Sequence, residues 1–175
     1  GHNGADFCSF GPNQGYGEPI LAAHDGIVVS LSYDQKWGST KGNGIYLQSL
    51  DGTFATIYWH LSEIQVVIGQ QVKAGDVIGL MGNTAAVFSG DGRKPSPKEP
   101  YLGTHLHFAL LIHGKEGNEY GGFCDPGPYM VSLGDKLRIY FARNLSVVYS
   151  GDDVSWLQTC LKLEGFAEDY EPIGY

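Results

Sequence analysis

The sequence predicts a mainly β protein, built as a small antiparallel sheet or sandwich and followed by a short C-terminal helical appendage. The 175 residues include 26 glycines and 8 prolines, a composition that suits short strands joined by turns. Two β-rich runs, 45–50 and 53–61, are separated by Asp51-Gly52, which is a strong hairpin signal. Only residues 152–165 have a clear helical period. Strands therefore dominate the expected fold.

The other elements follow from turn residues and apolar patterns. Residues 1–15 hold too many turn residues for a regular element, and we expect a loop there, extended or irregular rather than helical between His2 and Asp6. Residues 18–33 predict two short strands about Asp25-Gly26, and residues 69–82 repeat the rhythm of short strand, glycine turn and short strand. Apolar residues in and just before this last stretch are expected to fill a core between sheets: Val66, Val67, Val72, Val77, Ile78 and Leu80.

The end of the chain changes character. Val154, Leu157 and Leu161 recur at a helical spacing, Asp152 or Asp153 can cap the helix at its start, and Gly165 can end it. We therefore expect two parts, a β domain over residues 1–132 and a partial second module over residues 133–175. Because the chain starts on what looks like a functional motif, we also expect it to be a piece of a longer product.

Composition excludes some classes of function. The formal net charge is −8 with only 11 Lys and Arg, which argues against nucleic-acid binding. There is no run of about eighteen apolar residues, so we expect no membrane span. Three cysteines, Cys8, Cys124 and Cys160, are too few for a disulfide scaffold. Cys8 is interpreted as a small buried side chain, with a metal ligand as the alternative.

The strand that organises the chain is the apolar run 103–111. Because side chains alternate across a strand, His105 and His107 share one face, and Leu106, Phe108 and Leu110 line the other. Alone, such a pair is as readily structural as functional. Near the start of the chain, however, His2 and Asp6 lie four positions apart. Imidazole and carboxylate suit Zn²⁺, and a catalytic zinc needs three protein ligands and one open position. We therefore expect a metal site that joins these distant segments.

Two further histidines differ in interest. His60 ends the second strand of the hairpin, and alternation puts it on the same face as Tyr58 and Thr56. It gains weight only from the metal-type residues elsewhere in the chain. His24, beside the turn at Asp25, is interpreted as a turn histidine.

Taken together, these motifs resemble the lysostaphin/LytM-like zinc endopeptidases of bacterial cell walls. The residues that carry the resemblance are His2-x-x-x-Asp6, Tyr58-Trp59-His60-Leu61-Ser62 and His105-Leu106-His107-Phe108, together with the strand-and-turn patterns at 18–28, 67–75 and 78–84. The likeness covers roughly residues 1–130. Residues 136–166 are similar to the opening of a peptidoglycan-binding helical repeat, through the run Gly151-Asp152-Asp153-Val154-x-x-Leu157-Gln158.

The resemblance implies a fold, an activity and a site. The fold would be a small antiparallel β domain of the duplicated-hybrid-motif type with a groove over the metal. The activity would be hydrolysis of peptide cross-links in peptidoglycan, outside the cytoplasm, in the periplasm or cell wall or after secretion. One Zn²⁺ per chain would be held by His2, Asp6 and His107. His105 would act as base and His60 would orient water or stabilise the oxyanion, and these two assignments could be exchanged.

Two other functions compete with this one. The first is a non-catalytic wall-binding or hydrolase-activating module of the same fold, and the presence of all five site-type residues favours the enzyme. The second is a zinc-stabilised structural domain, disfavoured because structural sites are usually closed and rich in cysteine. The loop at 85–102 is longer than the family's usual turn. Its Arg93, Lys94 and Lys98 are either solvated or contact substrate carboxylates. The sequence gives no oligomeric state.

Overall fold

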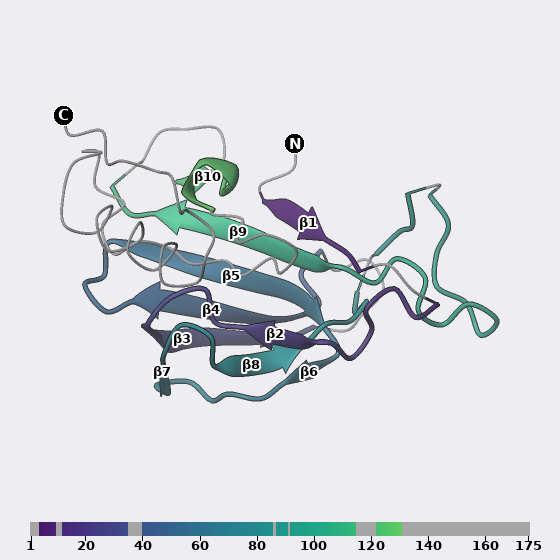
Figure 1. Ribbon diagram of the computed structural model, residues 1–175, viewed down its shortest axis with the longest axis horizontal. Helices are drawn as coiled ribbons and strands as arrows, with labels where there is room; N and C mark the ends of the chain where they lie inside the picture. The colour runs from purple at the N-terminus through teal and green to yellow at the C-terminus, as the bar shows by residue number, and fades with distance from the viewer. Residues whose placement is uncertain are drawn as a thin grey trace, which may run out of the picture.

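The computed structural model describes residues 4–9, 12–34, 40–85, 87–90, 92–114 and 122–130. These residues form a seven-stranded and a three-stranded sheet, in which all strand pairs are antiparallel (Figure 1). A single 3₁₀ turn, Gly127–Tyr129, is the only helical element in this part of the chain. The predicted mainly β fold is confirmed.

The large sheet has the order β1-β9-β5-β4-β3-β7, with β10 also paired to β9. Its strands are β1 (Ala5–Phe7), β3 (Gly26–Tyr33), β4 (Asn43–Ser49), β5 (Phe54–Leu61), β7 (Gln71–Val72), β9 (Leu106–Ile112) and β10 (Phe123–Cys124). The small sheet has the order β2-β8-β6, from β2 (Pro19–Leu21), β8 (Val77–Leu80) and β6 (Glu63–Ile64). In Figure 1 the small sheet lies across β3 and β4, while the long loop before β9 extends to the right.

The core lies between the two sheets. Ile20 and Ile78 of the small sheet pack with Val28, Ile45 and Leu47 of the large one. Burying a side chain of this kind contributes about 1.5–3 kcal/mol, so this contact holds the layers together. The core prediction for the 66–80 region is partly wrong. Val66, Val72 and Ile78 are buried, but Val67 is 66% and Val77 46% exposed, because one lies in a turn and the other on the outer face of β8.

The predicted hairpin at Asp51-Gly52 is confirmed. Asp51 accepts hydrogen bonds from the Ser49 hydroxyl at 2.8 Å and from the backbone N–H of Thr53 at 3.0 Å, and Gly52 has φ +72°. These hydrogen bonds, chiefly those from Thr53, hold the pKa of the Asp51 carboxyl below its usual value. Local turn chemistry thus fixes where β4 ends and β5 begins.

The start of the chain is extended around Asp6, as expected, but it forms a paired strand rather than a loop. Residues Ala5–Phe7 form β1, which pairs with Phe108, His107 and Leu106 of β9. A three-residue strand next to glycine has no local signal, but β9 offers it an open edge of backbone donors and acceptors. A contact between segments about a hundred residues apart therefore decides the structure here.

Several predictions fall on residues that the structure does not describe: His2, the 152–165 helix, the module at 133–175 and Cys160. The boundary at residue 132 stays a prediction. Cys8 is exposed, so its interpretation as a buried side chain is wrong, and both Cys8 and Cys124 are free thiols. No helix of the described residues is long and apolar enough to cross a membrane.

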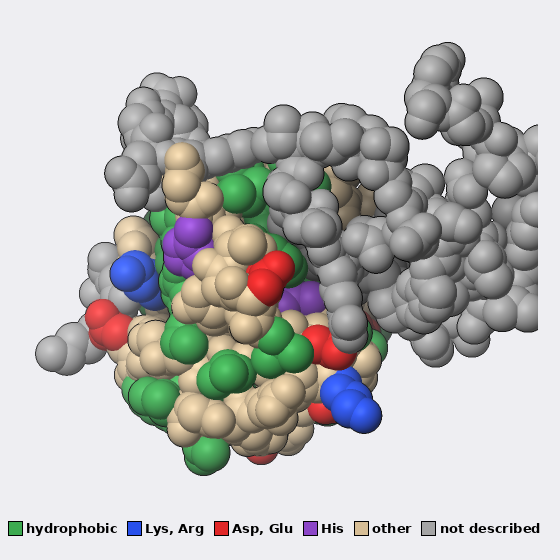
Figure 2. Space-filling view, turned by 90° about the vertical axis from the view of Figure 1, so that its left-hand side faces the viewer, with side chains coloured by type: hydrophobic (Ala, Val, Ile, Leu, Met, Phe, Trp, Pro, Cys, Tyr) green, Lys and Arg blue, Asp and Glu red, His purple; other side chains and the backbone are tan. Residues whose placement is uncertain are grey.

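The end face opposite the long loop has a mixed surface. Figure 2 shows hydrophobic side chains there as separate patches among polar and backbone atoms, with acidic and basic groups near one another at the edges. Scattered apolar side chains of this kind are ordinary for a protein surface.

Candidate active site

Asp6 and His107 meet because β1 pairs with β9. They are register partners, and Oδ1 of Asp6 lies 2.9 Å from Nδ1 of His107. The His107 ring is buried, and on its own sheet Trp59 of β5 stacks on it with ring centroids 4.8 Å apart and planes 13° apart. On another side lies Gly4, where a Cβ would come within 2.8 Å of His107 Nε2. The imidazole is thus held on several sides with Nδ1 facing the carboxylate.

His105 directly precedes β9 and, as predicted, lies on the same side as His107, where it faces the same carboxylate. Its Nδ1–H donates to the carbonyl oxygen of Gly103 at 2.8 Å, and its Nε2 lies 3.8 Å from Asp6 Oδ1. In the neutral ring a donating Nδ1 leaves Nε2 with the lone pair. His105 therefore presents a proton acceptor toward Asp6.

His60 reaches the site by an irregularity in β5. Asn43 pairs with Leu61 and Ile45 with Tyr58, so Trp59 and His60 both lie opposite Gly44. An extra residue on one strand is a β-bulge, and here His60 has φ +66°. The bulge turns the His60 ring toward His105 and His107, with centroids 4.7 and 6.1 Å away.

The prediction from alternation that His60 shares a face with Tyr58 is therefore wrong. Tyr58 points into the core, where its ring lies 5.4 Å from that of Phe108. His60 instead turns toward the histidines of β9. A bulge changes which residues share a face, because it breaks the two-residue repeat.

The His60 ring is buried and anchored at one nitrogen. Its Nδ1–H donates to the carbonyl oxygen of Thr84 at 2.9 Å. Burial, with a smaller contribution from the charge of nearby His105, lowers the pKa of His60 to about 4. The ring is therefore neutral at neutral pH, with its lone pair on Nε2.

The donor set of Asp6 and His107 fits a zinc ion. Carboxylate oxygen and imidazole nitrogen are zinc ligands, and two ligands at about 2.0–2.1 Å from a tetrahedral ion lie about 3.3 Å apart. The observed separation of 2.9 Å is close to that value. Within the described part of the chain no group of three or more His, Cys, Asp or Glu could hold a metal ion. The described residues thus supply two of the three predicted ligands, and His2 lies outside them.

A cavity adjoins this cluster on the large sheet. Its volume is about 270 Å³, and Trp59 both lines it and stacks on His107. The lining comes from several strands: Ser30, Leu31, Ser32, Lys41, Gly44, Ile45, Tyr46, Ile57, Trp59 and Phe123. The Lys41 ammonium lies 5.7 Å from the centre of the Trp59 ring. The cavity therefore offers mixed apolar and polar walls beside the histidines.

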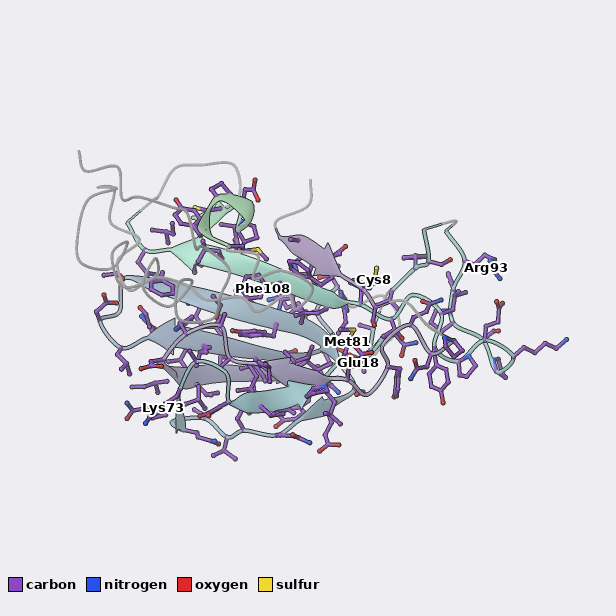
Figure 3. The ribbon with its side chains drawn as sticks, viewed as in Figure 1. Cys8, Glu18, Lys73, Met81, Arg93 and Phe108 are labelled. Carbon is purple, nitrogen blue, oxygen red and sulfur yellow. The ribbon has the colours of Figure 1, made fainter. Side chains whose placement is uncertain are left out.

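The long loop is a surface loop, as predicted. Its base is fixed where the N–H of Gly103 donates to the side chain of Gln14 at 3.0 Å. Farther out, Arg93 donates twice to the Glu99 carboxylate, at 2.8 and 3.0 Å. Figure 3 shows Arg93 far from Phe108 in the sheet, well out on the loop. These positions favour the solvated interpretation for Arg93.

His24 takes no part in the cluster. Its ring is buried, Nδ1–H donates to the carbonyl oxygen of Asp25 at 2.8 Å, and Nε2 is hydrogen-bonded to the Thr56 hydroxyl at 2.9 Å. Thr56 in turn is hydrogen-bonded to the Tyr58 hydroxyl at 3.0 Å, which accepts the N–H of Ala23. Burial lowers the pKa of His24 and raises that of Tyr58 to about 12.

Sequence reasoning missed two residues that contact the cluster. Trp59 stacks on the His107 ring, and the carbonyl oxygen of Thr84 accepts a hydrogen bond from His60 Nδ1–H. Both lie in stretches that carry the family resemblance, but neither residue type is a metal ligand. A large aromatic residue directly before a candidate histidine was the available signal for Trp59. Nothing in the sequence pattern marked the Thr84 carbonyl.

Comparisons with known proteins identify the relatives of this chain. A profile described as Peptidase family M23 matches residues 1–119. The peptidoglycan DD-endopeptidase ShyC of Vibrio cholerae is 33% identical over 117 residues, which is 67% of this chain and 22% of that protein. The glycyl-glycine endopeptidase ALE-1 of Staphylococcus capitis is 32% identical over 133 residues, 76% of this chain and 30% of that protein.

Solved structures agree with the sequence matches. The catalytic domain of lysostaphin from Staphylococcus simulans has a TM-score of 0.52 at 29% identity, covering 73% of this chain and 77% of that one. The chain spans between a fifth and a third of the length of the two curated relatives named above. On the match of the family profile to more than half of its residues, the chain belongs to peptidase family M23.

Proposed function

We propose that this chain is a zinc-dependent endopeptidase that hydrolyses peptide cross-links of bacterial peptidoglycan. One observation carries the proposal: Asp6 Oδ1 lies 2.9 Å from His107 Nδ1 and 3.8 Å from His105 Nε2, and the His60 ring is 4.7 Å from that of His105. Two side chains that can bind a metal, Asp6 and His107, thus lie beside two imidazoles, His105 and His60, whose Nε2 atoms can accept a proton. This combination matches the needs of metal-assisted hydrolysis.

The metal ligands in this proposal are His2, Asp6 and His107. His2 stands two residues before Gly4, whose backbone lies against the His107 ring. A set of two imidazoles and one carboxylate leaves one position open in a tetrahedral site, as catalytic zinc requires. When bound, zinc would lower the pKa of water to about 7 and polarise the scissile carbonyl.

The two other histidines move and hold protons. His105 Nε2 takes the proton of the attacking water and later delivers it to the leaving amine, because its Nδ1–H is committed to the Gly103 carbonyl. His60 is neutral and its Nε2 is an acceptor, which suits it to orient the water rather than to donate to an oxyanion. Of the two roles considered for His60, its hydrogen bonding supports orientation of the water.

The proposed substrate class rests on the family. Two relatives are named for cutting peptidoglycan or glycyl-glycine bonds. The cavity beside Trp59 adjoins the cluster only through Trp59, so the substrate class is proposed from the family. A wall substrate requires action outside the cytoplasm, in the periplasm, in the wall or after secretion.

The alternative is a non-catalytic wall-binding or activating module of the same fold. The Nε2 lone pairs of His60 and His105 favour the enzyme, since a binding scaffold needs no pair of proton acceptors beside metal ligands. A binding module would attach to walls without creating new chain ends.

The test is release of new amino groups from purified cell walls, together with loss of turbidity. We expect the zinc-loaded chain to clear walls and release amino groups, a chelator to stop both, and added zinc to restore them. The variant His105→Ala should keep its zinc and lose most turnover. Clearance that persists in the chelator, or wall binding without amino-group release, contradicts the proposal.

A further inference from the structure

The segment at 82–84 touches both the end of β5, which carries His60, and His105, the residue directly before β9. The carbonyl oxygen of Gly82 accepts the backbone N–H of His105 at 3.2 Å. A Cβ at Gly82 would lie 2.8 Å from the carbonyl oxygen of His60, so only glycine allows this approach. The segment therefore contacts the end of β5 and the start of β9 at once.

Thr84 makes four hydrogen bonds around the bulge. Its hydroxyl accepts the N–H of Asn43 at 2.9 Å and donates to the carbonyl oxygen of Leu61 at 3.0 Å. Its carbonyl oxygen accepts His60 Nδ1–H at 2.9 Å, and its N–H donates to the carbonyl oxygen of His60 at 3.4 Å. Asn43 and Leu61 are the register partners that flank the extra residue of β5. The Thr84 hydroxyl thus bridges the two strands where the bulge begins.

The backbone at this point needs such a bridge. His60 has φ +66° and Ala85 has φ +69°, values that side-chain-bearing residues rarely adopt. Conformations of this kind persist only where the surroundings fix them from several directions. Without the bridge, the strand could relax toward regular pairing, which would turn the ring of His60 toward the Tyr58 face.

We propose that Thr84 is a positioning residue for His60: its hydroxyl holds the bulge, and its carbonyl fixes the ring with the proton on Nδ1 and the lone pair on Nε2. The inference rests on the proposed function for its effect on turnover, but its structural part concerns the tautomer of His60 alone. Nothing in this role requires Thr84 to touch substrate or metal.

The experiment is a double-mutant cycle on the full zinc-loaded chain. Thr84→Val keeps the shape and removes the hydroxyl, and Thr84→Ser restores a hydroxyl. Both are made in the wild type and in the His60→Ala background, with kcat, KM and zinc content measured below each variant's unfolding transition. The ¹⁵N shifts of the His60 ring nitrogens, which distinguish the two neutral tautomers, are recorded for the wild type and the Thr84 variants.

We expect Thr84→Val to lower kcat by about tenfold or more with KM nearly unchanged, as displacement of a catalytic group does. Thr84→Ser should recover most of this loss. In the His60→Ala background, Thr84→Val should change kcat by less than about twofold, since coupled residues are not additive. The wild-type His60 should carry its proton on Nδ1, and Thr84→Val should broaden or shift that signal.

Three results would overturn the inference. One is an equal loss of kcat from Thr84→Val in both backgrounds, which indicates a general structural role. Another is full turnover in Thr84→Val. The third is a wild-type His60 with its proton on Nε2. This measurement uses the wild type alone, so it tests the inference even if Thr84→Val does not fold. A wild type without zinc-dependent turnover contradicts the proposed function instead, while the tautomer still tests the positioning of His60.

Discussion

Two histidines, His24 beside β5 and His60 within it, are buried to a similar extent but differ in their hydrogen bonds. The ring of His24 is hydrogen-bonded at both nitrogens, to the Asp25 carbonyl and the Thr56 hydroxyl. The ring of His60 is hydrogen-bonded at Nδ1 alone among the described residues, and its Nε2 remains as an acceptor beside His105 and His107. Burial lowers the pKa of both rings. The comparison teaches that bonding at the second nitrogen, rather than burial, separates a structural histidine from one available for chemistry.

The largest expected effect is the difference in kcat between a variant that lacks His60 and one that lacks His24. His60→Ala should lower kcat by about 100-fold, because loss of the group that orients the attacking water misplaces the nucleophile. His24→Ala should leave kcat per folded molecule unchanged, because His24 contacts none of the proposed site residues. The measurement is amino-group release at equal concentrations of folded, zinc-loaded protein. Equal losses in the two variants would erase the distinction.

Stability should separate them in the opposite sense. His24→Ala leaves the Asp25 carbonyl and the Thr56 hydroxyl without their partner and removes a ring that packs 4.6 Å from Phe54. We expect a loss of about 2 kcal/mol in the free energy of unfolding, measured in urea. The exposed His113 is the matched control, and His113→Ala should cost less than about 0.5 kcal/mol. A neutral His24→Ala would show that its hydrogen bonds do not stabilise the fold.

The pH dependence of stability sharpens the comparison further. Folded His60 takes up a proton only near its lowered pKa of about 4, whereas an unfolded histidine does so near about 6.5. Between these values the unfolded state binds more protons at this residue, so the contribution of His60 to the stability of the metal-free chain is full above about pH 6.5 and is lost as the pH drops toward 4. His60 contributes at most about 3 kcal/mol to this loss, and His24 adds in the same direction.

Urea unfolding of metal-free wild type and His60→Gln at pH 7 and pH 5 measures this contribution. The variant should lose less stability than the wild type between the two pH values, because glutamine does not titrate. Identical losses would show that His60 is not the group whose pKa is lowered.

The smallest effect is expected at the loop. Arg93 and Glu99 form an exposed ion pair at 2.8 Å, and such pairs contribute about 0–1 kcal/mol. Arg93→Ala should therefore change the unfolding free energy and the rate of wall clearance little. A strong loss of clearance at unchanged stability would revive the interpretation of Arg93 as a contact for substrate carboxylates.

Local chemistry explains which parts of the fold the sequence could predict. The Asp51-Gly52 hairpin was predictable because Asp51 and Gly52 themselves form the turn. The strand at Ala5–Phe7 was not, because its partner on β9 lies about a hundred residues away. Val77 shows the same limit, since its apolar side chain points outward on β8 and is 46% exposed. Which strands pair, and which side chains of a strand point into the core, depends on distant strands that a local sequence pattern does not indicate.

The candidate site divides in the same way. Asp6, His105 and His107 could be brought together from their chemistry, because a metal explains why such residues recur in distant segments. The face of His60 could not, since the bulge opposite Gly44 breaks the alternation on which the prediction relied. Trp59 and Thr84 act through stacking and a backbone carbonyl, which residue type alone does not indicate.

The most direct test of the central claim is the zinc content of the purified full chain and two variants, measured by elemental mass spectrometry. We expect about one zinc per chain in the wild type and in His105→Ala, and almost none in His107→Ala, because imidazole ligands hold zinc and a neighbouring base does not. Full zinc content in His107→Ala, or equal loss from both variants, would contradict the division of these two histidines into ligand and base.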